Sequence, residues 1–76
     1  MICHIKSILA QLGPKPPKMG ELADSIGVNR NTISRLTNNE HVPNLELAFD
    51  IRDKLNQWAV ERGKELNWTI DDIWSR

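Results

Sequence analysis

The strongest constraint on the fold is a pair of short segments with helical spacing, residues 18–26 and about 30–37, separated by Gly27. A glycine at this point indicates a sharp turn with positive φ, which glycine adopts without a steric penalty. Asn29 follows as a good N-cap for the second segment. The small side chain of Ala23 fits a position that the second helix is expected to cross at close distance. The pattern therefore predicts two short helices that cross at a steep angle about a tight turn.

Apolar side chains in this region are expected to fill the space between the two helices. They are Leu22, Ile26, Val28, Ile33 and Leu36. The opposite face of the second helix is polar, and outside such a pattern a polar helix face is usually only solvated. In this chain, that polar face carries Arg30, Asn31, Ser34 and Arg35.

The remainder of the chain is also predicted to be helical, without strands or repeats. A first helix is expected over residues 2–12 and ends at Gly13-Pro14. Asn44 is expected to cap the longest helix. The apolar stripe of that helix is predicted to consist of Leu45, Ala48, Ile51, Leu55 and Trp58.

The C-terminal third contains a predicted helix end and a predicted helix start. Gly63 is expected to stop or bend the long helix, because glycine weakens a helix by about 1 kcal/mol relative to alanine. Residues 69–72 resemble a capping box for a last helix, with Asp72 in the place of the usual glutamate.

Length and composition place the chain among small soluble domains. With 76 residues, 39% of them hydrophobic and 26% charged, we expect a single domain over residues 1–76. No apolar run approaches the ~20 residues of a membrane span. The first residues lack the features of a signal peptide, so we expect a cytoplasmic protein.

Composition also bears on chemistry. Cys3 is the only cysteine, so no internal disulfide forms within one chain. Cys3, His4 and His41 are too few to predict a metal site, which needs about four ligands. No Ser/His/Asp set and no phosphate-binding loop is present, so we expect no enzyme, no cofactor and no small-molecule ligand.

The charge distribution favours the first half of the chain as the nucleic-acid-binding half. Net charge is zero, which taken alone argues weakly against nucleic acid. Residues 1–43 carry five basic and three acidic side chains, whereas residues 44–76 carry five and seven. The two-helix motif therefore lies in the half with net charge +2, although an imbalance of this size also arises by chance.

Residues 19–39 resemble the lambda-repressor and Cro-like helix-turn-helix family of transcriptional regulators. The matching segments are Glu21-Leu22-Ala23, Ile26-Gly27-Val28, Thr32-Ile33-Ser34-Arg35, the continuation from Asn38 through Pro43-Asn44-Leu45-Glu46-Leu47-Ala48, and the tail Leu66–Trp74. The resemblance implies an all-α, lambda-repressor-like DNA-binding domain with about five helices, the motif at about residues 19–38. It implies a sequence-specific regulator of transcription, a repressor, whose recognition helix at about residues 30–37 enters the major groove.

The same resemblance implies which side chains contact double-stranded DNA. Base contacts fall on Arg30, Asn31, Ser34 and Arg35, although Arg35 has the alternative of pairing with Glu40. Contacts to phosphate or to the edge of the site fall on Asn29, Thr32, Lys18, Asn38 and Asn39. His41 is more typical of a turn residue.

The chain departs from the family pattern at several positions. Met19 stands where the family usually has a glutamine that touches a phosphate, and Pro16-Pro17 replaces a shorter polar entry. About ten extra residues, 56–65, are expected to extend the fourth helix.

The extra residues bear on assembly. One recognition helix contacts few base pairs, so we expect a homodimer, with contacts at about Trp58 and Trp74. The alternative function is a protein–protein adaptor, or the partner module of a toxin, that retains the fold.

Overall fold

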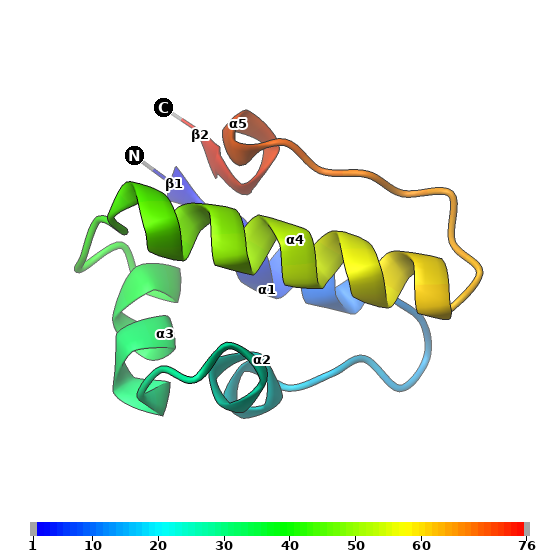
Figure 1. Cartoon of the computed structure of the whole chain (residues 1–76), viewed down its shortest axis with the longest axis horizontal. Helices are drawn as coiled ribbons and strands as arrows, with labels where there is room; N and C mark the ends of the chain where they lie inside the picture. Colours follow the sequence, from blue (N-terminus) through cyan, green and yellow to red (C-terminus); the bar gives the residue numbers. More distant parts are fainter. Residues whose placement is uncertain (1, 76) are drawn as a thin grey trace.

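The computed structural model describes residues 2–75, which form five helices and a two-stranded sheet around one core (Figure 1). The helices are α1 (Ile5–Ala10), α2 (Met19–Ile26), α3 (Arg30–Thr37), α4 (Leu45–Glu61) and α5 (Ile70–Ile73). The strands are β1 (Ile2–Cys3) and β2 (Trp74–Ser75). The predicted mainly helical architecture with about five helices is confirmed.

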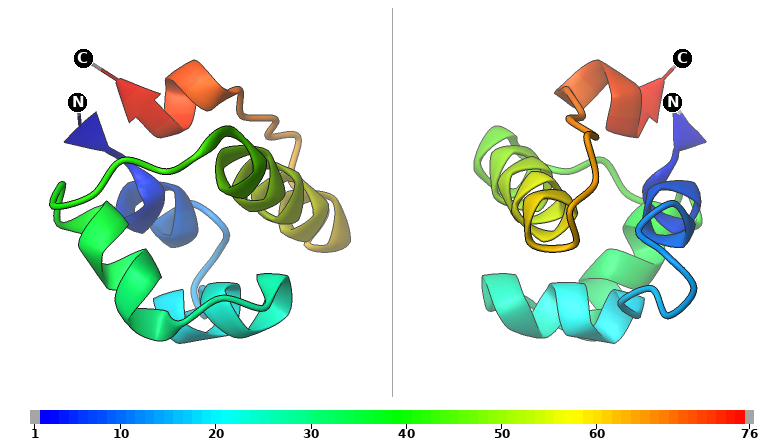
Figure 2. Two further views of the ribbon diagram at one scale, coloured as in Figure 1. Left: turned by 60° about the vertical axis from the view of Figure 1, so that its left-hand side comes forward. Right: turned by 90° about the vertical axis from the view of Figure 1, so that its right-hand side faces the viewer.

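The long helix α4 crosses the middle of the molecule and separates two groups of elements. Both Figures 1 and 2 show α2 and α3 on one side of α4, and α5 with the two strands on the other. Both chain ends therefore lie on the side away from α2 and α3.

The core contains side chains from every helix. The largest of those that are completely or almost completely buried are Ile5, Leu12, Leu22, Ile33, Leu36, Ile51, Leu55 and Ile73. Because α2 and α3 share this core with α4, the polar face of α3 is held on a packed support rather than on a loop.

The prediction of a first helix over residues 2–12 is too long, and the expectation of no strand is wrong. Ile2 pairs with Ser75 and Cys3 with Trp74 in an antiparallel ladder. The backbone N–H of His4 also donates to the carbonyl oxygen of Ile73 at 2.7 Å. These partners lie some seventy residues away in sequence, so helical spacing near the N-terminus does not reveal them.

The tryptophans complete the core near the chain ends. Trp68 is 8% exposed and Trp74 6% exposed, while Trp58 is half-buried. Burial raises the pKa of the neighbouring Cys3 thiol above its ordinary value. The indole of Trp74 packs within its own chain, and a dimer contact at this residue stays a prediction.

Two predictions about α4 need correction. Leu45 is 70% exposed, because it precedes the point where the helix reaches the core, and the buried face begins at Ala48. The helix ends at Glu61 rather than near 65, and Gly63 adopts a φ of 68°. Residues 62–69 then run back along the molecule without regular structure (Figure 1).

One side chain fastens this returning segment to α4. The side-chain amide of Asn56 accepts a hydrogen bond from the backbone N–H of Trp68 at 2.7 Å and donates one to the backbone carbonyl of Trp68 at 3.0 Å. Both hydrogen bonds are partly buried. They fix the position at which the chain enters α5, and they hold Trp68 in the core.

The two predicted caps beyond α3 are confirmed. The Asn44 side chain accepts from the Leu47 N–H at 2.8 Å, and Thr69 and Asp72 form a reciprocal capping box. None of the helices in the described part of the chain is long and apolar enough to cross a membrane.

Replacing Asn56 with alanine is expected to lower the free energy of unfolding by about 1–3 kcal/mol, because two partly buried hydrogen bonds are lost. Urea denaturation measures this change. The exposed neighbour Asn67 provides the control, and its replacement with alanine should change stability by less than about 0.5 kcal/mol. Equal stability of the two variants would contradict this role for Asn56.

Candidate nucleic-acid interface

The turn between α2 and α3 has the geometry that the sequence predicts. Gly27 adopts the left-handed conformation, with φ of 75° and ψ of 30°. The Val28 N–H donates to the carbonyl oxygen of Ala23 at 3.0 Å, which closes the turn. A side chain at residue 27 would be strained at this φ. The turn therefore sets the direction in which α3 leaves α2.

The helix α3 begins at its predicted cap. The side-chain oxygen of Asn29 accepts from the backbone N–H of Asn31 at 2.7 Å. Ile33 and Leu36 are completely buried, and Thr37 is nearly so. The opposite face of α3 is consequently turned to solvent.

That outer face carries the four side chains predicted to contact bases. Arg30, Asn31 and Arg35 are exposed, whereas Ser34 is half-buried. Three of the four border a shallow hollow of about 470 Å³ between the N-terminal ends of α2 and α3. The hollow is lined by Lys18, Met19, Gly20, Glu21, Arg30, Asn31 and Ser34. The fold thus brings the first turn of α3 and the start of α2 to one surface.

Arg30 has a partner on α2 that the sequence analysis missed. Its guanidinium Nη2 donates to the Oδ2 of Asp24 at 2.8 Å. The Arg30 side chain remains 70% exposed and that of Asp24 61% exposed. This hydrogen bond lowers the pKa of the Asp24 carboxyl and raises the pKa of Arg30. The pair is solvent-exposed, so other anions can compete for the arginine.

Two of the predicted phosphate contacts already use their side-chain oxygens within the protein. Asn29 caps α3, and the Oδ1 of Asn39 accepts from the Cys3 N–H at 2.8 Å. Asn39 has a φ of 62°, so its left-handed turn orients the side chain toward β1. Their remaining amide N–H groups are still donors.

The other predicted residues lie on α3, directly after α3 and directly before α2. Thr32 is half-buried, and Asn38 is exposed at the C-terminal end. Lys18 is exposed and precedes the first residue of α2. Arg35 forms no ion pair with any described residue; its carbonyl oxygen, rather than its side chain, accepts from the Glu40 N–H at 2.9 Å.

The structure shows the role of Met19, which stands where the family usually has a glutamine. It is half-buried and packs against the hydrophobic core, rather than presenting a polar group at the start of α2. Lys18, one residue earlier, places a positive charge at that helix end. The position that commonly holds a glutamine is used here for packing.

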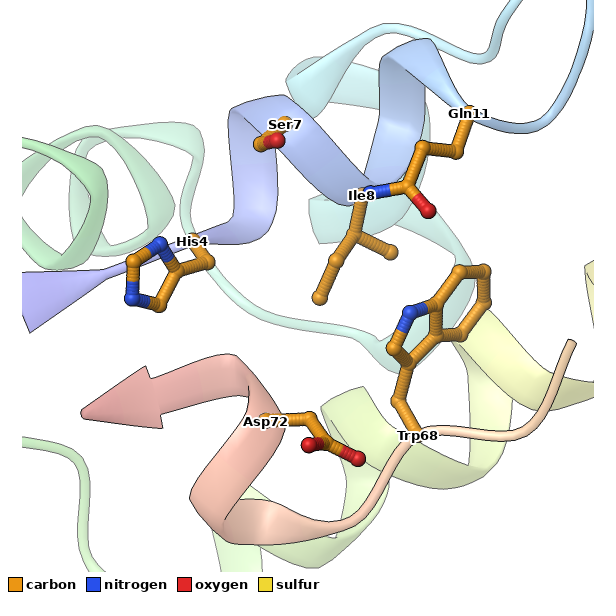
Figure 3. A pocket seen from close by; sticks show the side chains of 6 residues that line it. All are labelled: His4, Ser7, Ile8, Gln11, Trp68 and Asp72. Carbon is orange, nitrogen blue, oxygen red and sulfur yellow. The ribbon is translucent and has the colours of Figure 1, made fainter.

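A second hollow, of about 400 Å³, lies on the side of the chain ends. Figure 3 shows its side chains, four from α1 and its flanks and two from the C-terminal segment. They are His4, Ser7, Ile8, Gln11, Trp68 and Asp72. His4 Nε2 is within 2.6 Å of the Ser75 Oγ, so this histidine ties the two chain ends together.

The comparison with known families decides the classification. A family model described as helix-turn-helix matches residues 18–57, which is more than half of the chain and includes α2, the turn, α3 and most of α4. The chain belongs to the lambda-repressor/Cro-like helix-turn-helix family. No curated protein and no solved structure matches the chain.

This family consists of DNA-binding regulators of transcription and is generally non-enzymatic. The surface formed by α2 and α3 is the part of this chain that corresponds to its DNA-binding motif.

The ion pair between Arg30 and Asp24 is expected to be visible as a carboxyl that titrates below the usual range for aspartate. The folded-state pKa is lowered, so the pair contributes to stability above the unfolded-state pKa, and that contribution is lost as pH falls through the folded-state value. An NMR titration of the Asp24 carboxyl measures it. Replacing Arg30 with alanine should raise this pKa, and high salt should do so in part. An unchanged pKa in the variant would contradict the pairing.

Proposed function

We propose that this protein is a sequence-specific, double-stranded-DNA-binding transcriptional regulator that acts as a repressor. The observation that carries the proposal is the exposed polar first turn of α3, held by a buried face beside the start of α2. Such a helix enters the major groove with its N-terminal residues toward the base edges.

The side chains of that first turn suit base recognition. Arg30 has five N–H donors and can bind the O6 and N7 of guanine through two of them. Asn31 can bind the N6 and N7 of adenine in the same way. Ser34 and Arg35 follow one turn later and extend the contact along the groove. We therefore expect these four residues together to contact several adjacent base pairs.

The remaining predicted residues are proposed as contacts to phosphate. Lys18 lies at the start of α2, where helix N–H groups also favour an anion. Thr32 lies on the first turn of α3, and Asn38 follows its last residue. Asn29 and Asn39 contribute through their amide N–H groups only, because their side-chain oxygens are occupied. These contacts position the protein without specifying the sequence.

Repression follows from occupancy of DNA. A small domain that covers one promoter site excludes other proteins from it without a catalytic step. The proposed localisation is the cytoplasm. The runner-up, an adaptor that retains the fold, predicts no preference for any DNA sequence.

A homodimer is proposed because one α3 contacts too few base pairs for tight binding. Trp58 is the half-buried member of the predicted contact that a partner can reach. Exposed apolar side chains also lie at the start of α4, namely Val42, Leu45 and Phe49. Leu45 and Trp58 are thirteen residues apart, about 20 Å along a helix, so they represent alternative surfaces.

Substitution on each surface tests the dimer. Sedimentation should show a dimer for the wild-type protein and a monomer for one of the variants Trp58→Ala and Leu45→Ser. A wild-type protein that stays monomeric at high concentration, both free and on DNA, would contradict the dimer.

Replacing Arg30 or Lys18 with alanine should have different effects. Arg30→Ala is expected to cost about 1–3 kcal/mol on the preferred site and to relax discrimination at one base pair. Lys18→Ala should weaken binding to all sequences alike and reduce the slope of log K against log salt by about one unit. Fluorescence anisotropy titrations at two salt concentrations measure both effects.

The exposed Lys64, which lies in the returning segment, provides the matched control. Its replacement with alanine removes one positive charge away from α2 and α3 and should leave discrimination unchanged. An equal loss on all sequences for Arg30→Ala would remove this residue from the proposed base contacts.

A further inference from the structure

Gly20 is unlike the other glycines of the chain. Gly13, Gly27 and Gly63 have positive φ, and a Cβ added to any of them would meet nothing within 4 Å. Gly20 lies inside α2 without a positive φ, so its backbone accepts other residues. A Cβ at residue 20 would lie 3.2 Å from both the Cζ and the Nε of Arg30. The missing side chain at residue 20 therefore leaves the space that the Arg30 side chain occupies.

Asp24 lies one helical turn after Gly20 on the same face of α2, because residues four apart on a helix are neighbours. Its Oδ2 accepts the hydrogen bond from the Nη2 of Arg30 at 2.8 Å. The Arg30 side chain thus lies across α2, over a position without a side chain and against a carboxylate. We call the pair Gly20 and Asp24 the Arg30 seat.

Stability does not explain the Arg30 seat. The Arg30 and Asp24 side chains are 70% and 61% exposed, and exposed ion pairs contribute little to folding. Glycine in a helix is unfavourable relative to alanine. What the seat does achieve is to restrict where a long, flexible arginine can lie.

We propose that Gly20 and Asp24 are specificity-determining residues, which hold Arg30 in the position from which it contacts a base. This inference rests on the proposed function. Asp24 accepts from one of the guanidinium N–H groups and leaves others for guanine O6 and N7. An arginine without the seat is free to turn to a phosphate, which is present at every sequence. The seat therefore increases discrimination more than it increases affinity.

The first test replaces Gly20 with alanine. The new Cβ displaces Arg30 rather than the backbone, because the atoms that it meets belong to a flexible side chain. Discrimination at one base pair of the preferred site should fall about tenfold, within the range of one bidentate base contact. Thermal stability should be equal or higher, because alanine favours the helix. A variant that retains wild-type discrimination would overturn the proposal.

The second test replaces Asp24 with asparagine. Removing a negative charge near DNA raises affinity for every sequence, so the informative quantity is the ratio between preferred and singly substituted sites. That ratio should fall about tenfold at the base pair affected by Gly20→Ala. In an Arg30→Ala background, Asp24→Asn should leave the ratio unchanged. A fall in the ratio without Arg30 would assign the effect to charge alone and overturn the proposal.

Asp53 supplies the matched control. It also pairs with an arginine, the half-buried Arg52, at 2.9 Å, but on α4. Asp53→Asn should leave discrimination unchanged. If the wild-type protein prefers no sequence, the proposed function fails and the inference fails with it. If the wild-type protein discriminates and both seat variants discriminate equally well, only the inference fails.

Discussion

The interface depends on the packing of α3 against α2 about the left-handed turn at Gly27. Leu22 and Ala23 on α2, and Ile33 and Leu36 on α3, are completely buried. Their contacts fix which side of α3 faces inward and so which side meets solvent. Because these side chains belong to one core cluster with those of α4, and α2 contacts α4 directly, the orientation of α3 belongs to the core of the whole molecule, and the exposed polar turn is presented on a rigid support.

Local rules were sufficient for the parts of the chain that carry the motif. The bounds of α2 and α3 and the caps at Asn29, Asn44 and Thr69 agree with prediction, because helix caps and turn glycines act over four or five residues. The site residues were assigned by resemblance to the family, and their contacts with DNA remain proposals. The structure brings four of them, Lys18, Arg30, Asn31 and Ser34, to one hollow.

Contacts between distant residues account for what the sequence did not predict. The pairing of β1 with β2, the two bonds of Asn56 to Trp68, and the ion pair of Arg30 with Asp24 each depend on tertiary placement. None of these contacts changes the helical spacing of apolar residues, so that spacing does not predict them. Gly20 is the clearest example, since no sequence pattern singles it out, whereas the structure places the Arg30 side chain against it.

The most direct test of the central claim is a selection from random double-stranded oligonucleotides with the purified protein, followed by titration of the winning sequence against scrambled DNA at two salt concentrations. The account predicts one enriched site with two inverted halves about 34 Å apart. It predicts binding to that site about 10³-fold or more tighter than to scrambled DNA. Absence of enrichment, with binding only at low salt, would contradict a sequence-specific regulator and favour a protein partner for this fold.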